Sequence, residues 1–169
     1  MFLKNQTIMN EGYEDKDNLF TKGIGSNIYI KNKKYLDLSF CAGTNLLGHN
    51  SAIFKNSIKQ LIKDNISNLA AKNSHAYEFS RTLKEVFPKY SKFIFCNSGT
   101  EAVFKSLRIA RAITKKDLII SVSGSWHGSV NELLYTTNKK LENIKLSEGL
   151  ESQTEKNIKF IPYNNIELS

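Results

Sequence analysis

One stretch of this 169-residue sequence constrains its fold more than any other. A short apolar run at 93–96 has the character of a buried strand, and it leads through Asn97-Ser98-Gly99 into a pattern with the helical period. Ser98 and Glu101 have the spacing of a capping box, in which Ser98 accepts from first-turn amides and Glu101 reaches back to the amide of Ser98. Gly99 leaves the backbone bare, so free N–H groups at this helix start could bind a phosphate monoester. A capping box that only starts a helix explains these residues alone equally well.

Two further apolar segments, 118–122 and 158–161, are predicted as strands, and they alternate with helical patterns. Such alternation is typical of parallel βαβ units in a doubly wound α/β sheet. Ligands of these sheets bind beyond the carboxyl ends of the strands. Ser98-Gly99-Thr100 and Trp126-His127-Gly128 each follow a predicted strand end. We therefore expect both segments at one edge of the sheet, as a single site requires.

The N-terminal half carries a different pattern. The first twenty residues are polar and are predicted to form an arm. Segments 27–31 and 35–40 alternate and predict a β-hairpin, with Leu36, Leu38 and Phe40 on one face. Its turn has no glycine, so the sequence does not define the turn type. Helices are expected from Ser51 to about Leu69, capped by Asn50-Ser51, and from about Ala76 to Phe87. His49 is interpreted as a structural histidine that fixes its loop by hydrogen bonds.

The composition weighs against several classes of protein and one kind of site. The net charge is +8, yet the lysines are spread along the chain, which indicates a solvated surface more than a nucleic-acid-binding one. The two cysteines lie in apolar segments and are expected to be buried, reduced thiols. No signal peptide or membrane span is predicted, and we expect a cytoplasmic location without membrane contact. The histidines and cysteines do not have metal-ligand spacing, so no metal site is predicted.

The central motifs resemble those of a known family. The order Asn97-Ser98-Gly99-Thr100-Glu101-Ala102, Leu107-Arg108-Ile109-Ala110-Arg111, Thr114 and Trp126-His127-Gly128 resembles the cofactor-binding stretch of the class III aminotransferases. These are pyridoxal-phosphate enzymes of fold type I that include glutamate-1-semialdehyde aminomutase. The resemblance implies an N-terminal arm and β-hairpin segment over 1–50, the first part of the cofactor-binding large domain over 51–169, and a homodimer when complete.

The resemblance also assigns roles to individual residues. Ser98, Gly99 and Thr100 would hold the phosphate of pyridoxal 5′-phosphate through backbone N–H groups and the Thr100 hydroxyl. Trp126 occupies the position where the family has tyrosine or phenylalanine stacked on the pyridine ring; a core aromatic is the alternative. His127 would be a supporting residue beside the cofactor, and Gly128 would let the backbone turn away from the ring.

No catalytic residue is assigned in this sequence. The Schiff-base lysine of the family is expected downstream of Ser169, which makes the chain an N-terminal part, inactive alone, of an aminotransferase or aminomutase acting on a small amino acid, aldehyde or keto substrate. It could be a fragment, half of a split enzyme, or a non-catalytic remnant that binds a phosphate ligand or a partner protein. Phe40-Cys41-Ala42 replaces the Gly-Ser-Trp of the aminomutases, which leaves the substrate open. Net charge is the one feature that favours a nucleic-acid binder instead.

Overall fold

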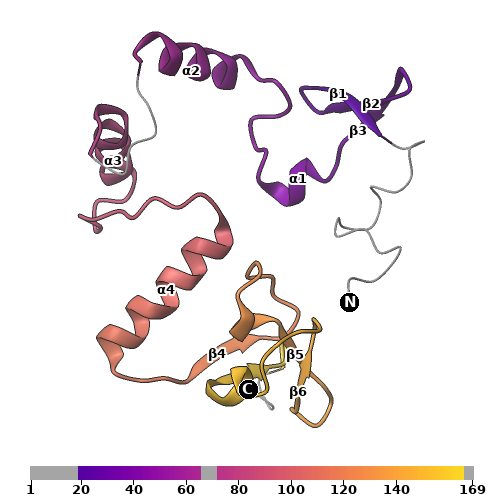
Figure 1. Cartoon of the computed structure of the whole chain (residues 1–169), viewed down its shortest axis with the longest axis vertical. Helices are drawn as coiled ribbons and strands as arrows, with labels where there is room; N and C mark the ends of the chain where they lie inside the picture. The colour runs from indigo at the N-terminus through magenta and orange to yellow at the C-terminus, as the bar shows by residue number, and fades with distance from the viewer. Residues whose placement is uncertain (1–18, 66–71, 166–169) are drawn as a thin grey trace, which may run out of the picture. The chain divides into compact units, whose positions relative to one another are not determined.

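The computed structural model describes residues 19–65 and 72–165, and these fall into two compact units, Met1–Ser74 and His75–Ser169 (Figure 1). Residues 1–18 of the predicted arm, and residues 66–69 at the end of the helix predicted to start at Ser51, lie outside the described residues. The domain division after residue 50 refers to the complete enzyme and stays a prediction.

The first unit contains a three-stranded antiparallel sheet in the order β1 (Phe20–Ile24), β2 (Asn27–Ile30) and β3 (Lys33–Leu36). The predicted hairpin is the β2–β3 pair, in which Ile30 lies opposite Lys33. Its two turn residues, Lys31 and Asn32, both have positive φ (45° and 66°), the signature of a type I′ turn made here without glycine. β1 was not expected, because its sequence lacks a clear alternation.

The expected apolar face of this hairpin is not buried. Leu38 is 85 % exposed and lies beyond β3, whereas Asp37 is buried at 8 % exposure. A buried carboxylate is stable only when its oxygens accept hydrogen bonds, and Asp37 accepts three. After a short left-handed turn labelled α1 (Phe40–Gly43), helix α2 (Ala52–Lys63) begins at Ser51, whose Oγ accepts from the Phe54 amide as predicted.

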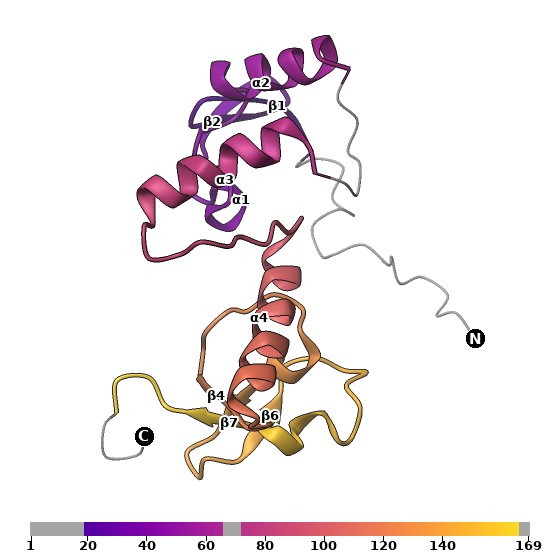
Figure 2. The same ribbon diagram turned by 90° about the vertical axis from the view of Figure 1, so that its left-hand side faces the viewer.

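The second unit is built on helix α4 (Gly99–Thr114) and the parallel strands β4 (Ile119–Val122) and β7 (Ile158–Ile161), which confirm two predicted strands. Between them lie the 3₁₀ turn η2 (Asn131–Leu133), the antiparallel pair β5 (Tyr135–Thr137) and β6 (Asn143–Lys145), and the turn η3 (Thr154–Asn157). Figure 2 shows α4 alongside β4 and β7. The core of this unit consists of five buried apolar residues: Val130, Leu133, Tyr135, Ile158 and Phe160. Val103 and Leu107 of α4 are partly buried and pack against it.

The strand predicted at 93–96 does not form. Helix α3 (Ser74–Val86) ends just before Pro88, as expected, and the chain then runs without strand pairing to Asn97. Ile94 is 62 % exposed, and the Phe95 ring stacks on Phe79 of α3 at a centroid distance of 5.2 Å. A strand requires a neighbour for its backbone groups, and the described residues supply none here. The cysteines also differ from expectation, since Cys41 is exposed and Cys96 half-buried.

Candidate active site

The start of α4 is capped by its own first turn. The Ser98 hydroxyl accepts a hydrogen bond from the Glu101 amide at 3.1 Å, as predicted. The Glu101 carboxylate binds the Asn97 amide at 3.0 Å, one residue earlier than the predicted Ser98 amide. Lys105 donates to the same carboxylate, and this ion pair lowers the pKa of Glu101, helped by the Asn97 amide, while it raises the pKa of Lys105.

This capping leaves three donors unused. Among residues 19–65 and 72–165, the backbone N–H groups of Ser98, Gly99 and Thr100 have no hydrogen-bond acceptor. A Cβ built at Gly99 would meet no atom within 4 Å, so the space beside these amides is open. The N-terminus of a 16-residue helix adds partial positive charge. Consecutive free amides beside open space are the donor set that an anion such as a phosphate group needs.

A loop after β4 is tied to this helix start. The Ser129 amide donates to Thr100 Oγ1 at 3.1 Å, and Gly128 packs directly against Thr100 with φ +71°. Ser98, Thr100 and Ser129 line one cavity of about 390 Å³, together with residues of α4, of η2 and the residue before η2: Glu101, Phe104, Asn131, Glu132 and Val130. The structure therefore brings the two motifs predicted at the sheet edge into contact through Thr100.

Trp126 and His127 lie on the same loop but outside that cavity. Trp126 is 78 % exposed, which excludes the alternative that it is a core aromatic in this structure. His127 Nε2 lies 2.9 Å from the hydroxyl of Ser121, a buried residue of β4. The roles of Ser98, Gly99, Thr100, Trp126 and His127 toward a cofactor stay predictions. Sequence reasoning missed Ser121 and Ser129; a serine inside the apolar run Ile119-Ile120-Ser121-Val122 is the signal that could have pointed to the first.

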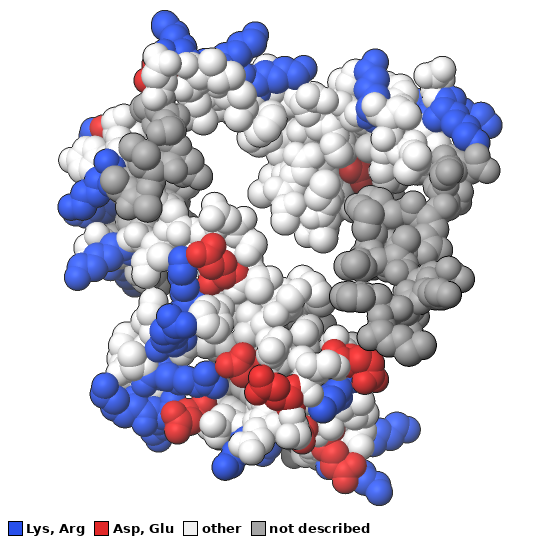
Figure 3. Space-filling view, in the orientation of Figure 1, with Lys and Arg blue, Asp and Glu red and all other residues white. Residues whose placement is uncertain are grey.

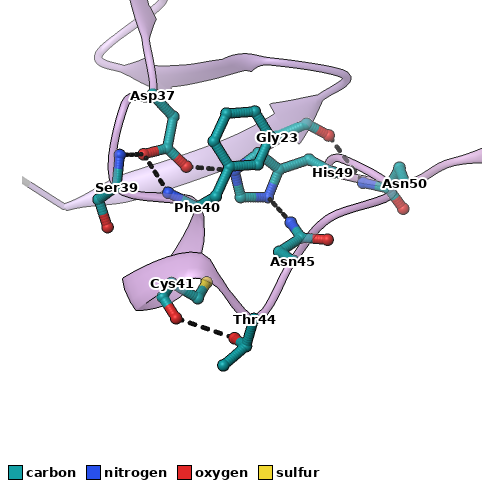
Figure 4. A network of polar contacts seen from close by, with 9 residues as sticks. All are labelled: Gly23, Asp37, Ser39, Phe40, Cys41, Thr44, Asn45, His49 and Asn50. Atoms are coloured by element: carbon teal, nitrogen blue, oxygen red, sulfur yellow. Dashed lines mark hydrogen bonds and ion pairs between the residues drawn. The ribbon is translucent and has the colours of Figure 1, made fainter. Parts of the chain in front are cut away.

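A second polar cluster lies in the first unit (Figure 4). Asp37 accepts from the amides of Ser39 and Phe40 at 2.9 and 3.1 Å and from His49 at 2.7 Å. The hydrogen bond to His49, followed by those to the two amides, holds the pKa of Asp37 below its ordinary value against the opposing effect of burial. Asn45 contacts the other ring nitrogen of His49, and the Phe40 ring stacks on its imidazole. This cluster fits the structural role predicted for His49.

Other kinds of site find little support in the described parts of the chain. No group of three or more His, Cys, Asp or Glu side chains there is arranged to hold a metal ion. Of the helices described, none combines the length and hydrophobicity needed to cross a bilayer.

Comparisons with known proteins agree with these motifs. The family model for class III aminotransferases matches residues 8–168. The chain is 30 % identical to glutamate-1-semialdehyde 2,1-aminomutases of Archaeoglobus fulgidus and Natranaerobius thermophilus, over 86 % and 91 % of its own length. Its fold matches an omega-transaminase from Sphaerobacter thermophilus with a TM-score of 0.77 and 22 % identity, covering 88 % of this chain and 36 % of that one. A glutamate-1-semialdehyde aminomutase from Pseudomonas aeruginosa matches with a TM-score of 0.75 and 16 % identity, covering 89 % of this chain and 33 % of that one.

The chain belongs to the class III aminotransferases. This confirms the predicted family, the fold type I architecture and, at the level of the family, pyridoxal 5′-phosphate as the cofactor; a transaminase with PLP bound is among the structural matches, at a TM-score of 0.74. The chain spans about a third of the length of the curated relatives, 35 % and 36 % of the two aminomutases.

Proposed function

We propose that this chain is the N-terminal part of a pyridoxal-phosphate-dependent aminotransferase or aminomutase, and that it binds the phosphate of the cofactor at the start of α4. One observation carries the proposal: three consecutive free amides, of Ser98, Gly99 and Thr100, face open space at a helix N-terminus. The Thr100 hydroxyl adds a fourth donor, because its oxygen accepts from Ser129 while its hydrogen stays available.

The remaining residues of the site would orient the ring. The exposed Trp126 indole offers an apolar face for stacking on a pyridine, and His127 supports the loop beside it. The cofactor, when bound, supplies an electron sink for the carbon that loses or gains the amino group. Lys105 is the single lysine of α4, but its ion pair with Glu101 favours the protonated form, which is not nucleophilic. We propose that the reactive lysine comes from residues outside this sequence.

The substrate is proposed as a small amino acid, aldehyde or keto compound. The curated relatives carry the name glutamate-1-semialdehyde 2,1-aminomutase, which supports an aminomutase-like activity, while Phe40-Cys41-Ala42 favours another amino-group transfer. A homodimer in the cytoplasm without nucleic-acid binding is part of the same proposal. Figure 3 supports the last point, because Lys and Arg are spread over both units and, in the second, lie among acidic residues.

A non-catalytic remnant that binds a phosphate ligand is the second candidate, favoured by the same free amides. The two candidates share the phosphate site and differ in turnover once the missing part of the enzyme is supplied.

Substitution of Gly99 tests the phosphate site. Gly99→Val places a branched side chain in the open space, and its Cβ meets no protein atom within 4 Å, so we expect the fold to be retained while binding weakens by on the order of 2 kcal/mol, the scale of lost charge-assisted hydrogen bonds. Ala102→Val, on the exposed side of the same helix, is the matched control. Affinity is measured by absorbance titration with pyridoxal phosphate. Equal affinity of Gly99→Val and the parent would remove the start of α4 from the site.

A further inference from the structure

We infer that Ser121 is a positioning residue for Trp126: it anchors the loop that presents the indole, acting through His127. The inference rests on the proposed function only in that the indole is taken to meet the cofactor ring. The anchoring itself concerns contacts within the second unit.

The contact between Ser121 and His127 is built into the strand. Ser121 is 8 % exposed and lies on the side of β4 that faces the core. A buried hydroxyl in an otherwise apolar strand carries a desolvation cost unless it is hydrogen-bonded. Its partner is His127 Nε2, 2.9 Å away. This bond joins the rigid strand to the residue that directly follows Trp126.

The loop is held a second time, two residues further on. Ser129 donates its amide to Thr100 Oγ1 at 3.1 Å, and Gly128 leaves no room for a side chain against Thr100. The backbone after Trp126 is therefore fixed both to β4 and to the start of α4. The indole itself makes no hydrogen bond or ring contact with any described residue.

A side chain that is 78 % exposed, with no hydrogen bond or ring contact among the described residues, has little packing to fix its direction. Its orientation is set by the backbone that carries it, and binding a ligand then costs the entropy of ordering whatever the backbone leaves free. Loss of the Ser121 anchor should loosen the backbone at Trp126 and raise that cost. Thr100, by contrast, serves both the loop and the helix, whereas the Ser121 hydroxyl can be removed without touching the phosphate site.

Trp126 is the single tryptophan of the sequence, so its fluorescence reports on this loop alone. Ser121→Ala removes the hydroxyl, Ser121→Cys keeps a side chain of similar size with weak hydrogen bonding, and Ser121→Thr keeps the hydroxyl. Ser125→Ala is the matched control, since Ser125 is exposed, lies next to Trp126, and its hydroxyl makes no hydrogen bond with the described residues.

Time-resolved fluorescence anisotropy without cofactor is the first measurement. We expect a larger amplitude of fast local motion in Ser121→Ala and Ser121→Cys, and parent-like motion in Ser121→Thr and Ser125→Ala. Parent-like motion in both the alanine and the cysteine variant, or equal loosening in Ser125→Ala, overturns the inference. The cysteine variant keeps the test valid if Ser121→Ala does not fold.

Quenching of Trp126 by added pyridoxal phosphate is the second measurement. We expect affinity to fall roughly 3- to 10-fold in Ser121→Ala, the ordering cost of one side chain, and to be unchanged in Ser125→Ala. If the parent shows no quenching while the anisotropy results hold, the anchoring stands and the proposed cofactor site fails. If affinity is unchanged in a Ser121→Ala protein with a loosened loop, the positioning role is overturned.

Discussion

Thr100 lies where a side chain on Gly128 would have to go. A Cβ at Gly128 would stand 3.0 Å from the Cα of Thr100 and would overlap its hydroxyl oxygen. Because Gly128 also has a φ of +71°, glycine is required there for two independent reasons. This contact joins the loop after β4 to the start of α4.

Replacing Gly128 should therefore cost more than replacing another left-handed glycine of the same loop. Gly124 has φ +83° but open space around it, so Gly124→Ala should destabilise by about 1 kcal/mol, the cost of a left-handed alanine. Gly128→Ala should add roughly 1–3 kcal/mol for the overlap with Thr100. Urea unfolding followed by far-ultraviolet circular dichroism gives both values. Equal losses in the two variants would contradict the close packing of Gly128.

The Asp37 cluster predicts a pH dependence in the first unit. Hydrogen bonds from His49 and from the amides of Ser39 and Phe40 lower the pKa of Asp37 in the folded protein. A lowered pKa gives stabilisation that is complete above the ordinary aspartate value of about 4 and is lost as the pH falls through the lower, folded value.

Hydrogen exchange tests this directly. Protection of the Ser39 and Phe40 amides, relative to their intrinsic exchange rates, should fall as the pH drops below about 4. Asp37→Asn should reduce their protection at neutral pH and remove the acid dependence, whereas Asp117→Asn in the second unit should leave it unchanged. Protection that is constant down to strongly acidic pH would show that the carboxylate does not hold this turn.

The chain alone is expected not to catalyse transamination. Lys105, near the proposed phosphate site, is held by Glu101, and the pKa of an ordinary surface lysine is about 10.4, which makes it a poor nucleophile at neutral pH. Purified protein with pyridoxal phosphate should show no turnover with glutamate or other amino donors. Borohydride reduction and peptide mapping should find no lysine labelled stoichiometrically. One fully labelled lysine together with turnover would mean that an unrecognised residue does the chemistry.

Self-association is expected as well. Among the described residues, five apolar side chains are buried, while large ones such as Ile120 (60 % exposed) and Ile113 on α4 face solvent. The two-stranded β4–β7 sheet also has open edges, which pair readily with other chains. Sedimentation velocity should show oligomers or aggregates at micromolar concentration. A compact monomer with one cooperative melt would show that these residues form a self-sufficient domain.

The sequence by itself determined the features that depend on neighbours along the chain. The Ser98 cap, the start of α2 at Ser51 and the end of α3 before Pro88 are local, since each involves residues within four positions. β4 and β7 were recognisable because most of their residues are apolar, as is typical of strands in a parallel sheet. The contiguous motif from Asn97 to Gly128 was sufficient to identify the family.

Tertiary structure decided what depends on distant partners. The segment 93–96 has a strand-like composition but no neighbour among the described residues, and backbone pairing cannot be read from one segment alone. Asp37 is buried in place of Leu38 because His49, twelve residues away, binds its carboxylate. The contact of Thr100 with Ser129 spans 29 residues, and no local pattern encodes it. Hydrogen bonds of this kind form only when the fold brings the two groups together, which is why the sequence predicted candidate site residues but not the contacts between them.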